Sequence, residues 1–431
     1  MSKVKIIGAG LAGVECAYFL AKRGIEVELF EMRPLKMTQA HKTKEFAELV
    51  CSNSLRSKDV NTAVGLLKLE MSKLGSLVIN SAYKHEIVAG TSLTVDRKNF
   101  SEEITKIIEA EPNIKIKREE VTKIDDQAIT VIAAGPLISL ELAKELQNYL
   151  GDDELFFYDA IAPIISLDSI NLEVCYYKDR YDKGSGEYLN CPMNKEEYDL
   201  FYNELIKAEK HAPKDFEKNV FEGCMPIEAM AIRGKETLRF GPFKPVGLEK
   251  NGFKPYAVVQ LRPDDAIKSM YNLVGFQTSL KHGEQKRIIR LIPGLENANI
   301  LRYGVIHKST YINAPFSIKA NYQTKDYPNL YIAGQLSGVE GYVESAASGL
   351  ALGIYLYQRL NNLDEKLLPT TTAIGSLGRY LSLPNSKFMP MNINYGIIDD
   401  FLDVKKKERK AKIKERSIKA LIEYKEECKW I

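Results

Sequence analysis

Two cysteines stand in settings suited to chemistry. Cys51 lies in the polar segment LVCSNSLR at 49–56, and Cys224 lies between a glycine and a proline in FEGCMPIE at 221–228. We expect a helix directly after Cys51, and a helix N-terminus together with Arg56 makes a thiol reactive. A thiolate is a nucleophile that forms covalent intermediates with electron-poor carbons. The alternative, an inert buried cysteine, is the one that we expect for Cys16, Cys175, Cys191 and Cys428.

A glycine-rich loop near residue 10 indicates a dinucleotide-binding site. An apolar strand over 3–8 leads into the sequence GAGLAG at 8–13, and a helix and a second strand follow, the strand ending at Glu31. Gly8 allows a tight turn, Gly10 lets the backbone approach a pyrophosphate, and Gly13 lets the helix pack closely on the strand. The helix N-terminus favours the phosphates, and Glu31 is placed to accept hydrogen bonds from ribose hydroxyls.

Two later segments favour FAD as the bound dinucleotide. TVIAAG at 130–135 and NLYIAG at 329–334 each have the pattern of a short buried strand that closes in glycine. A helix rich in small residues is expected from about residue 343, and its N-terminus would favour negative charge on a reduced flavin. A tightly packed core helix is the alternative. The predicted cofactor contacts are Gly8, Gly10, Leu11, Ala12, Gly13, Glu31, Met32, Arg33, Gly135, Gly334, Gln335, Glu340 and Gly341.

The order of these segments resembles that of glutathione-reductase-like flavoproteins. We therefore predict an α/β fold, a glutathione-reductase-like FAD-binding Rossmann domain with an inserted α/β substrate domain. A single GxGxxG motif means that NADH or NADPH would bind only transiently. Inside the insertion we expect strands over 173–177 and 241–243 and a helix over 195–210. The expected division is 1–165 and 301–403 for the two parts of the FAD-binding domain, 166–300 for the inserted substrate and RNA domain, and 404–431 for a basic C-terminal helix.

Composition argues against several classes of protein. The 431 residues are 45% apolar and 27% charged, and they contain neither a membrane-spanning apolar stretch nor a secretory signal. The six cysteines have no CxxC spacing and the five histidines no HxxxH spacing, so we expect neither a disulfide framework nor a metal site. These features predict a cytoplasmic protein. The oligomeric state, monomer or dimer, is left open.

A basic segment at 405–419 suggests a polyanionic partner. It holds nine Lys or Arg and two Glu, a net charge of +7 in a chain whose total is +3, so the remainder carries −4. The alternative is a solvated face of a helix that turns Ile413, Ala420 and Leu421 inward.

Several long blocks resemble the bacterial folate- and FAD-dependent RNA (uracil-5-)-methyltransferases. They are the two cysteine segments, RYGVIHKSTYINAP at 302–315 and AGQLSGVEGYVESAASGL at 333–350, and the resemblance extends essentially end to end. It implies that a methylene from methylenetetrahydrofolate and a hydride from NADH or NADPH convert a uridine of the tRNA T-loop to 5-methyluridine. Some members act on 23S rRNA instead, and the sequence leaves both targets open. The chain has Ala134 where the family usually has threonine, so one polar contact near the cofactor would be missing.

The resemblance also implies roles for the two thiols. Cys224 is expected to add to the 6-carbon of uracil, with Glu222 and Glu228 nearby, and Cys51 to act where the methylene is delivered. Two other classes fit part of the sequence: a plain NAD(P)H-dependent flavin oxidoreductase, and an FAD-bound RNA-binding module without activity. Neither explains both cysteine segments. The predicted RNA contacts are Arg233, Lys281, Lys286, Arg287, Lys405 and Lys406.

Overall fold

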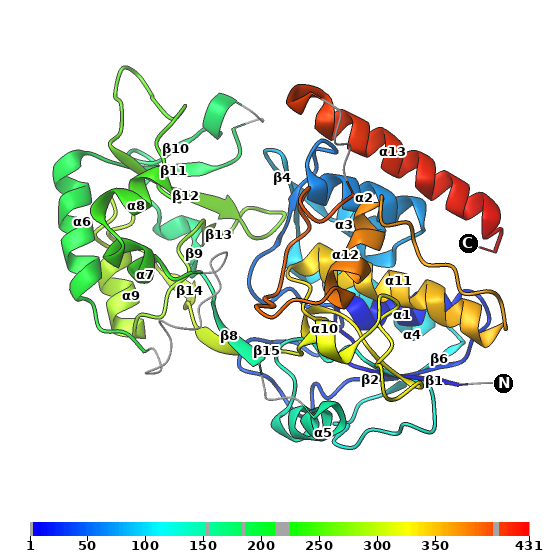
Figure 1. Ribbon diagram of the computed structural model, residues 1–431. Coiled ribbons are helices and arrows are strands. Elements are labelled where there is room, and N and C mark those ends of the chain that lie inside the picture. Colours follow the sequence, from blue (N-terminus) through cyan, green and yellow to red (C-terminus); the bar gives the residue numbers. More distant parts are fainter. Residues whose placement is uncertain (1–2, 152–154, 183–185, 212–224, 400–404, 431) are drawn as a thin grey trace.

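A five-stranded parallel sheet forms the centre of the larger of two lobes (Figure 1). The computed structural model describes residues 3–151, 155–182, 186–211, 225–399 and 405–430. The strand order β16-β7-β1-β2-β6 places a strand from residue 330 beside strands from the first third of the chain. The strands β1, β2, β7 and β16 are almost completely buried because helices cover the sheet, whereas the edge strand β6, with the sequence IKIK, is only partly buried. Their bounds are β1 Val4–Ile7, β2 Val27–Phe30, β6 Ile114–Lys117, β7 Thr130–Ile132 and β16 Leu330–Ile332.

Helices α1 and α11 pack against each other at unusually close range in this lobe. A Cβ added at Gly349 of α11 would lie 2.1 Å from the Ala12 carbonyl oxygen of α1, and one added at Gly353 would lie 3.1 Å from Phe19. Figure 1 shows α13 lying along the outside of the lobe next to α2. The helices of this lobe are α1 Leu11–Ala21, α2 Ala63–Lys73, α3 Leu77–Lys84, α4 Arg97–Ala110, α5 Leu140–Leu150, α10 Ala314–Ser317, α11 Tyr342–Leu360, α12 Ala373–Ser382 and α13 Lys406–Glu427.

The second lobe is built on a six-stranded antiparallel sheet with its own hydrophobic core. The strand order is β10-β11-β12-β13-β9-β14, and the buried residues of this core fall between Ile165 and Ala298. Its strands are β9 Ile164–Ser166, β10 Tyr176–Tyr177, β11 Leu189–Met193, β12 Ala257–Pro263, β13 Met270–Leu273 and β14 Ile300–Arg302. Its helices are α6 Lys195–Lys207, α7 Ile227–Ile232, α8 Lys235–Phe240 and α9 His282–Ile289.

A two-stranded antiparallel ribbon carries the chain between the lobes. It pairs β8 (Leu155–Ala160) with β15 (Ile306–Tyr311), one on the way into the second lobe and the other on the way out. In Figure 1 this ribbon lies where the two lobes meet. A further small sheet, β3-β5-β4, follows the Cys51 segment, with β3 at Ser54–Ser57, β4 at Glu86–Ala89 and β5 at Ser92–Val95.

The predicted α/β class with a parallel nucleotide-binding sheet and an inserted module is confirmed, but several local predictions are wrong. No helix follows Cys51; the strand β3 does, and the next helix begins at Ala63. The segment 241–243 is a turn, in which the N–H groups of Gly241 and Phe243 both donate to Leu238. The strand expected over 173–177 is only two residues long, because Cys175 closes a turn on Asn171.

Candidate active site

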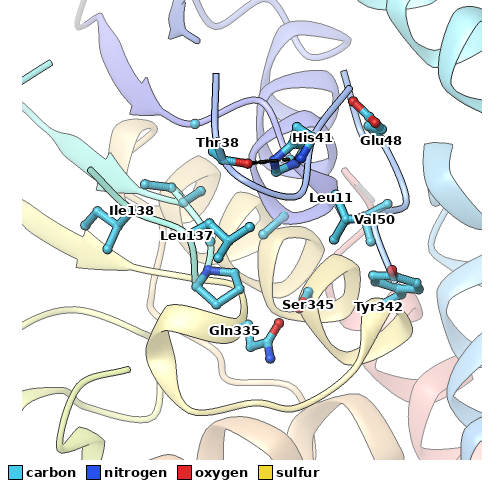
Figure 2. A pocket seen from close by; sticks show the side chains of 18 of the residues that line it. Leu11, Thr38, His41, Glu48, Val50, Leu137, Ile138, Gln335, Tyr342 and Ser345 are labelled. Carbon is cyan, nitrogen blue, oxygen red and sulfur yellow. Dashed lines mark hydrogen bonds between the residues drawn. The ribbon is translucent and has the colours of Figure 1, made fainter. Parts of the chain in front are cut away.

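A cavity of about 300 Å³ opens at the carboxyl ends of strands β1, β2, β7 and β16. In Figure 2, Thr38, His41 and Glu48 lie on one side of this cavity, and Gln335 and Ser345 lie on the other. All of the predicted cofactor residues except Gly13 line it, as does Cys51. The residues predicted to bind the nucleotide and the Cys51 thiol therefore line the same cavity.

The three glycines of the loop have different physical reasons to be glycine. Gly8 has φ +104°, and a Cβ there would lie 2.4 Å from the Ala133 carbonyl oxygen of the neighbouring strand segment. At Gly13 a Cβ would lie 1.9 Å from the carbonyl oxygen of Gly8, so the helix can pack on the strand only without a side chain. A Cβ at Gly10 would meet nothing within 4 Å, because Gly10 faces the cavity at the start of α1. The open space at Gly10 is a cradle for a group that approaches the backbone.

Glu31 directly follows β2, and both oxygens of its carboxylate accept hydrogen bonds. It accepts hydrogen bonds from the backbone N–H of Ala9 (3.2 Å) and from the Arg33 side chain (3.0 Å at Nε), and Arg33 also pairs with Glu48 at 3.0 Å. Burial opposes ionisation of Glu31, but Arg33 and the backbone donors outweigh it, so the pKa of Glu31 is lowered. The carboxylate is therefore an ionised, fixed acceptor at the cavity wall.

The segment before α11 forms the opposite wall. Gly334 (φ +77°) donates its N–H to Ser348 Oγ at 2.7 Å, and Gln335 Nε2 donates to Glu340 at 2.6 Å. Burial, and then nearby Asp159, raise the pKa of Glu340 well above its usual value. The two interpretations of the small-residue helix thus apply to different parts of it: the N-terminus of α11 faces the cavity, and the middle packs against α1.

Cys51 is half-buried beside the first residue of α11. Its backbone N–H donates to the Tyr342 hydroxyl at 2.7 Å, and the N–H of Ser52 donates to the same oxygen at 3.3 Å. Burial, and then the neighbouring Cys51, raise the pKa of Tyr342, so this hydroxyl stays protonated. The tip of the Tyr342 side chain, from the first residue of α11, thus contacts the backbone at Cys51. The helix expected directly after Cys51 is absent, and Arg56 pairs with Glu344 of α11.

Two residues of the Cys51 segment are tied to the second lobe. The buried amide of Asn53 donates to the Pro263 carbonyl at 3.0 Å, and Arg262 donates to Asn53 Oδ1 at 3.1 Å and to Ser52 Oγ at 2.8 Å. We call these four residues, Ser52, Asn53, Arg262 and Pro263, the lobe clasp. On the same side, Arg302 donates to the Val50 carbonyl at 2.7 Å. The second lobe therefore holds the chain on both sides of the thiol, through the Val50 carbonyl before it and the Ser52 and Asn53 side chains after it.

Cys224 and Glu222 lie outside the described residues, but the chain on both sides of them is anchored. The N–H of His211 donates to the Ser279 carbonyl and that of Ile227 to the Gln277 carbonyl, both at 2.7 Å. Glu228 is fully buried, and its carboxylate accepts from the Ser279 N–H at 2.7 Å and from the Thr278 hydroxyl at 3.0 Å. Glu228, which is close to Cys224 in sequence, thus anchors its own segment to residues 278–279.

The predicted RNA contacts do not form one cluster. Lys281 pairs with Glu209 at 2.5 Å, and Arg287 pairs with Glu284 at 2.7 Å. Their charges are thus balanced locally. Arg233 and Lys286 are exposed on the second lobe, whereas Lys405 is exposed at the start of α13 on the larger lobe; Lys406 begins that helix, and its side chain is outside the described part.

Sequence reasoning missed several polar residues of the cavity wall. Asp159 and His307 face each other at 3.4 Å, and Asp159 Oδ1 and His307 Nδ1 are buried without a hydrogen-bond partner in the described structure. A hydrogen bond of 2.7 Å joins the Thr38 hydroxyl to Nδ1 of His41. Burial, and then the charge of Arg33, lower the pKa of His41 to about 4. These residues lie on segments far apart in sequence, without a spacing motif. The weak signal available was His307, a polar residue on the buried face of a half-buried strand.

Neither a metal site nor a membrane span is found in the described ranges. No group of three or more His, Cys, Asp or Glu among them is arranged to hold a metal ion. Of the helices described, none has the length and apolar character needed to cross a bilayer.

The glycine loop after the central strand of a parallel sheet, with the cavity at the strands' carboxyl ends, defines a Rossmann-type dinucleotide-binding protein that carries a second lobe. The fold of Aquifex aeolicus GidA is similar: the form II crystal structure superposes with a TM-score of 0.69 at 17% identity, covering 98% of this chain and 73% of that one. The family model described as glucose inhibited division protein A matches residues 3–364.

Similarity in sequence is much higher to a set of curated enzymes. The methylenetetrahydrofolate–tRNA-(uracil-5-)-methyltransferase TrmFO of Acholeplasma laidlawii is 56% identical over 98% of this chain and 99% of the relative. The enzyme of the same name from Desulfitobacterium hafniense is 54% identical over 99% of both chains. This chain belongs to the glucose inhibited division protein A family and, within it, to the methylenetetrahydrofolate–tRNA-(uracil-5-)-methyltransferases.

Proposed function

We propose that this protein is a flavoenzyme that methylates the 5-carbon of a uridine in tRNA, with the methylene of methylenetetrahydrofolate as carbon source and NADH or NADPH as reductant. The observation that carries the proposal is the position of Cys51, a half-buried thiol in the wall of the dinucleotide cavity. Full-length identity above 50% to relatives named for this reaction supports it.

The cavity suits FAD in the chemistry of its walls. The backbone at Gly10 and the N-terminus of α1 would hold the pyrophosphate, and Glu31 would accept from the ribose hydroxyls. The segment from Gly334 to Gly341 and the N-terminus of α11 would face the flavin ring, where the helix dipole favours negative charge. FAD held there would take up the hydride and serve in the transfer of the one-carbon unit.

The two thiols divide the work on the substrate. The 5-carbon of uracil is a poor nucleophile until a thiolate adds to the neighbouring 6-carbon and makes an enolate. We assign that addition to Cys224. Cys51 acts where the carbon is delivered, and the Tyr342 hydroxyl and the lobe clasp fix its backbone.

RNA is the macromolecular partner, and tRNA is favoured because the relatives are named for it. A uridine in a folded RNA must leave its stack before a thiol can reach the 6-carbon. Exposed cations on α9 and α13 would neutralise phosphates. Mapping 5-methyluridine in tRNA and in 23S rRNA from a strain without this protein decides the target. Loss of 5-methyluridine from tRNA supports the proposal, and loss from 23S rRNA alone would show that rRNA is the substrate instead.

The origin of the methyl carbon tests the reaction itself. Purified protein should carry flavin absorbance and, with NADH or NADPH, should transfer label from the folate methylene carbon to uridine in an RNA transcript. A plain flavin oxidoreductase would consume NAD(P)H and leave the RNA unlabelled. Label that arrives from S-adenosylmethionine instead would overturn the proposal.

A further inference from the structure

Two aromatic rings stack on each other at the surface of the second lobe. His282, the first residue of α9, is exposed, and its imidazole lies on the ring of Tyr303 with centroids 4.3 Å apart and planes at 18°. Tyr303 is half-buried and belongs to neither hydrophobic core. The pair is thus a flat, partly exposed surface that the packing of the fold does not account for.

A buried glutamine fixes the geometry of the pair. Gln285 lies one turn along α9 from His282, and its side chain exchanges two hydrogen bonds of 2.8 Å with the backbone of Gly304, the residue after Tyr303. Gly304 itself has no room for a side chain, since a Cβ would lie 2.6 Å from the Ile161 carbonyl oxygen. The backbone next to Tyr303 is therefore fixed against α9, the helix that carries His282.

The pair follows directly in sequence on residues that contact described parts of the chain next to both cysteines. On one side, residues 277–281 receive both ends of the stretch that contains Cys224, through the backbone bonds of His211 and Ile227. These residues run directly into His282. On the other side, Arg302 precedes Tyr303 and donates to the carbonyl of Val50, the neighbour of Cys51.

We propose that His282 and Tyr303 form a stacking platform for an unpaired base of the RNA substrate. Every base has an aromatic face, and stacking on protein rings is the usual way in which splayed-out bases are held. The exposed Lys286 on the same helix adds a cation for the adjacent phosphates. The proposal rests on the proposed function only in taking RNA as the ligand.

The test uses the full-length, flavin-containing protein and a T-arm stem-loop RNA with 2-aminopurine at successive loop positions. Binding should quench the fluorescence at one of these positions by stacking. His282→Ala should abolish that quenching and weaken binding about 10-fold, with flavin absorbance unchanged. His282→Trp should restore both. Lys286→Gln is the matched control on the same helix: it should lower the salt dependence of binding and leave the quenching intact.

Each outcome decides one question. Unchanged quenching and affinity in His282→Ala would overturn the platform, as would failure of the tryptophan variant to restore quenching, because the ring would then not act by stacking. If the wild type shows the quenching but forms no 5-methyluridine, the proposed reaction fails and the platform stands.

Discussion

At the scale of single residues, burial separates the cysteines. Cys51 lines the cavity, whereas Cys16 is completely buried within α1. Cys51→Ala should therefore keep its flavin and lose 5-methyluridine formation by at least about 100-fold, because removal of a nucleophile or proton-transfer group costs this much. The measurements are flavin absorbance and labelled methyl in RNA.

Cys16→Ala is the matched control. It removes a sulfur from the core, which costs on the order of 1 kcal/mol of unfolding free energy, and it should leave activity intact at 25 °C. Full activity in Cys51→Ala would remove that thiol from the mechanism.

Gly10 and Gly13 should respond differently to the same substitution. Gly10→Ala adds a methyl group to open space, so the protein should fold normally and bind flavin poorly. Gly13→Ala forces a methyl group against a backbone oxygen and should lower the free energy of unfolding by ~3 kcal/mol. Thermal unfolding and flavin content separate the two effects. Equal flavin content in wild type and Gly10→Ala would show that no ligand approaches the backbone there.

Residues with a local reason for their identity could be predicted from the sequence. The glycine loop and Glu31 belong to one βαβ unit, so the spacing alone placed them on the cavity. Asp159, His307 and Tyr342 come from elements that meet only in the folded chain, and no spacing rule connects them. The bonds of Glu228 could not be predicted either, because nothing in FEGCMPIE shows that Thr278 and Ser279 lie against its carboxylate.

At the scale of elements, a buried carboxylate joins three helices. Glu70 of α2 accepts from the N–H groups of Ala373 and Ile374 at the start of α12, both at 2.8 Å, and from the Ser417 hydroxyl of α13. Burial raises the pKa of Glu70 to about 7, although the three donors oppose the shift. The folded state therefore binds more protons than the unfolded state between the ordinary pKa and pH 7.

A raised pKa makes stability fall as the pH rises through that window. Between about pH 4.5 and pH 7 Glu70 should reduce the unfolding free energy by up to about 1.4 kcal/mol per pH unit. Glu15, whose pKa burial likewise raises to about 7, should contribute a similar slope. Urea unfolding at pH 5, 6, 7 and 8 measures the total, and Glu70→Gln should make the profile shallower. An unchanged slope in that variant would mean that Glu70 does not titrate there.

Whether a segment is a helix could be predicted where its hydrophobic periodicity was strong, but which other elements it contacts could not. The inward positions Ile413 and Leu421 of α13 are buried as expected, whereas Ala420 is half-buried. The contact of Ser417 with Glu70 joins residues 347 positions apart, beyond any local pattern. The helix expected after Cys51 is a strand because Ser54 to Ser57 pair with β5, a tertiary preference that overrides local propensity.

At the scale of the whole molecule, the exposed charge of α13 lies on a different lobe from α9 (Figure 1). Lys405→Gln with Lys410→Gln should weaken binding to tRNA and to ribosomal RNA alike, because phosphate contacts carry no sequence information. The slope of log affinity against log salt should fall by about one per lost contact. Flavin content should not change. If the slope of log affinity against log salt equals that of wild type, these lysines do not contact RNA and belong to a solvated surface of the helix.

The division of the chain at residues 165, 300 and 403 stays a prediction. Composition and motifs suggested where a second module begins, but the ribbon β8–β15 shows that the connection is itself paired structure. Because the boundary falls near a hydrogen-bonded ribbon, the amino-acid composition does not change there in a way that would reveal it.

The lobe clasp should prevent one lobe from being replaced by recombination without the other. Arg262 and Pro263 come from the second lobe, but their partners Ser52 and Asn53 flank the thiol on the first. A recombination event that replaced the second lobe alone would bring foreign residues against an old Cys51 loop, leaving buried amide and guanidinium groups without partners. We therefore expect residues 49–54 to be exchanged between relatives only together with the segment around Arg262, so that two stretches some 200 residues apart form one heritable unit.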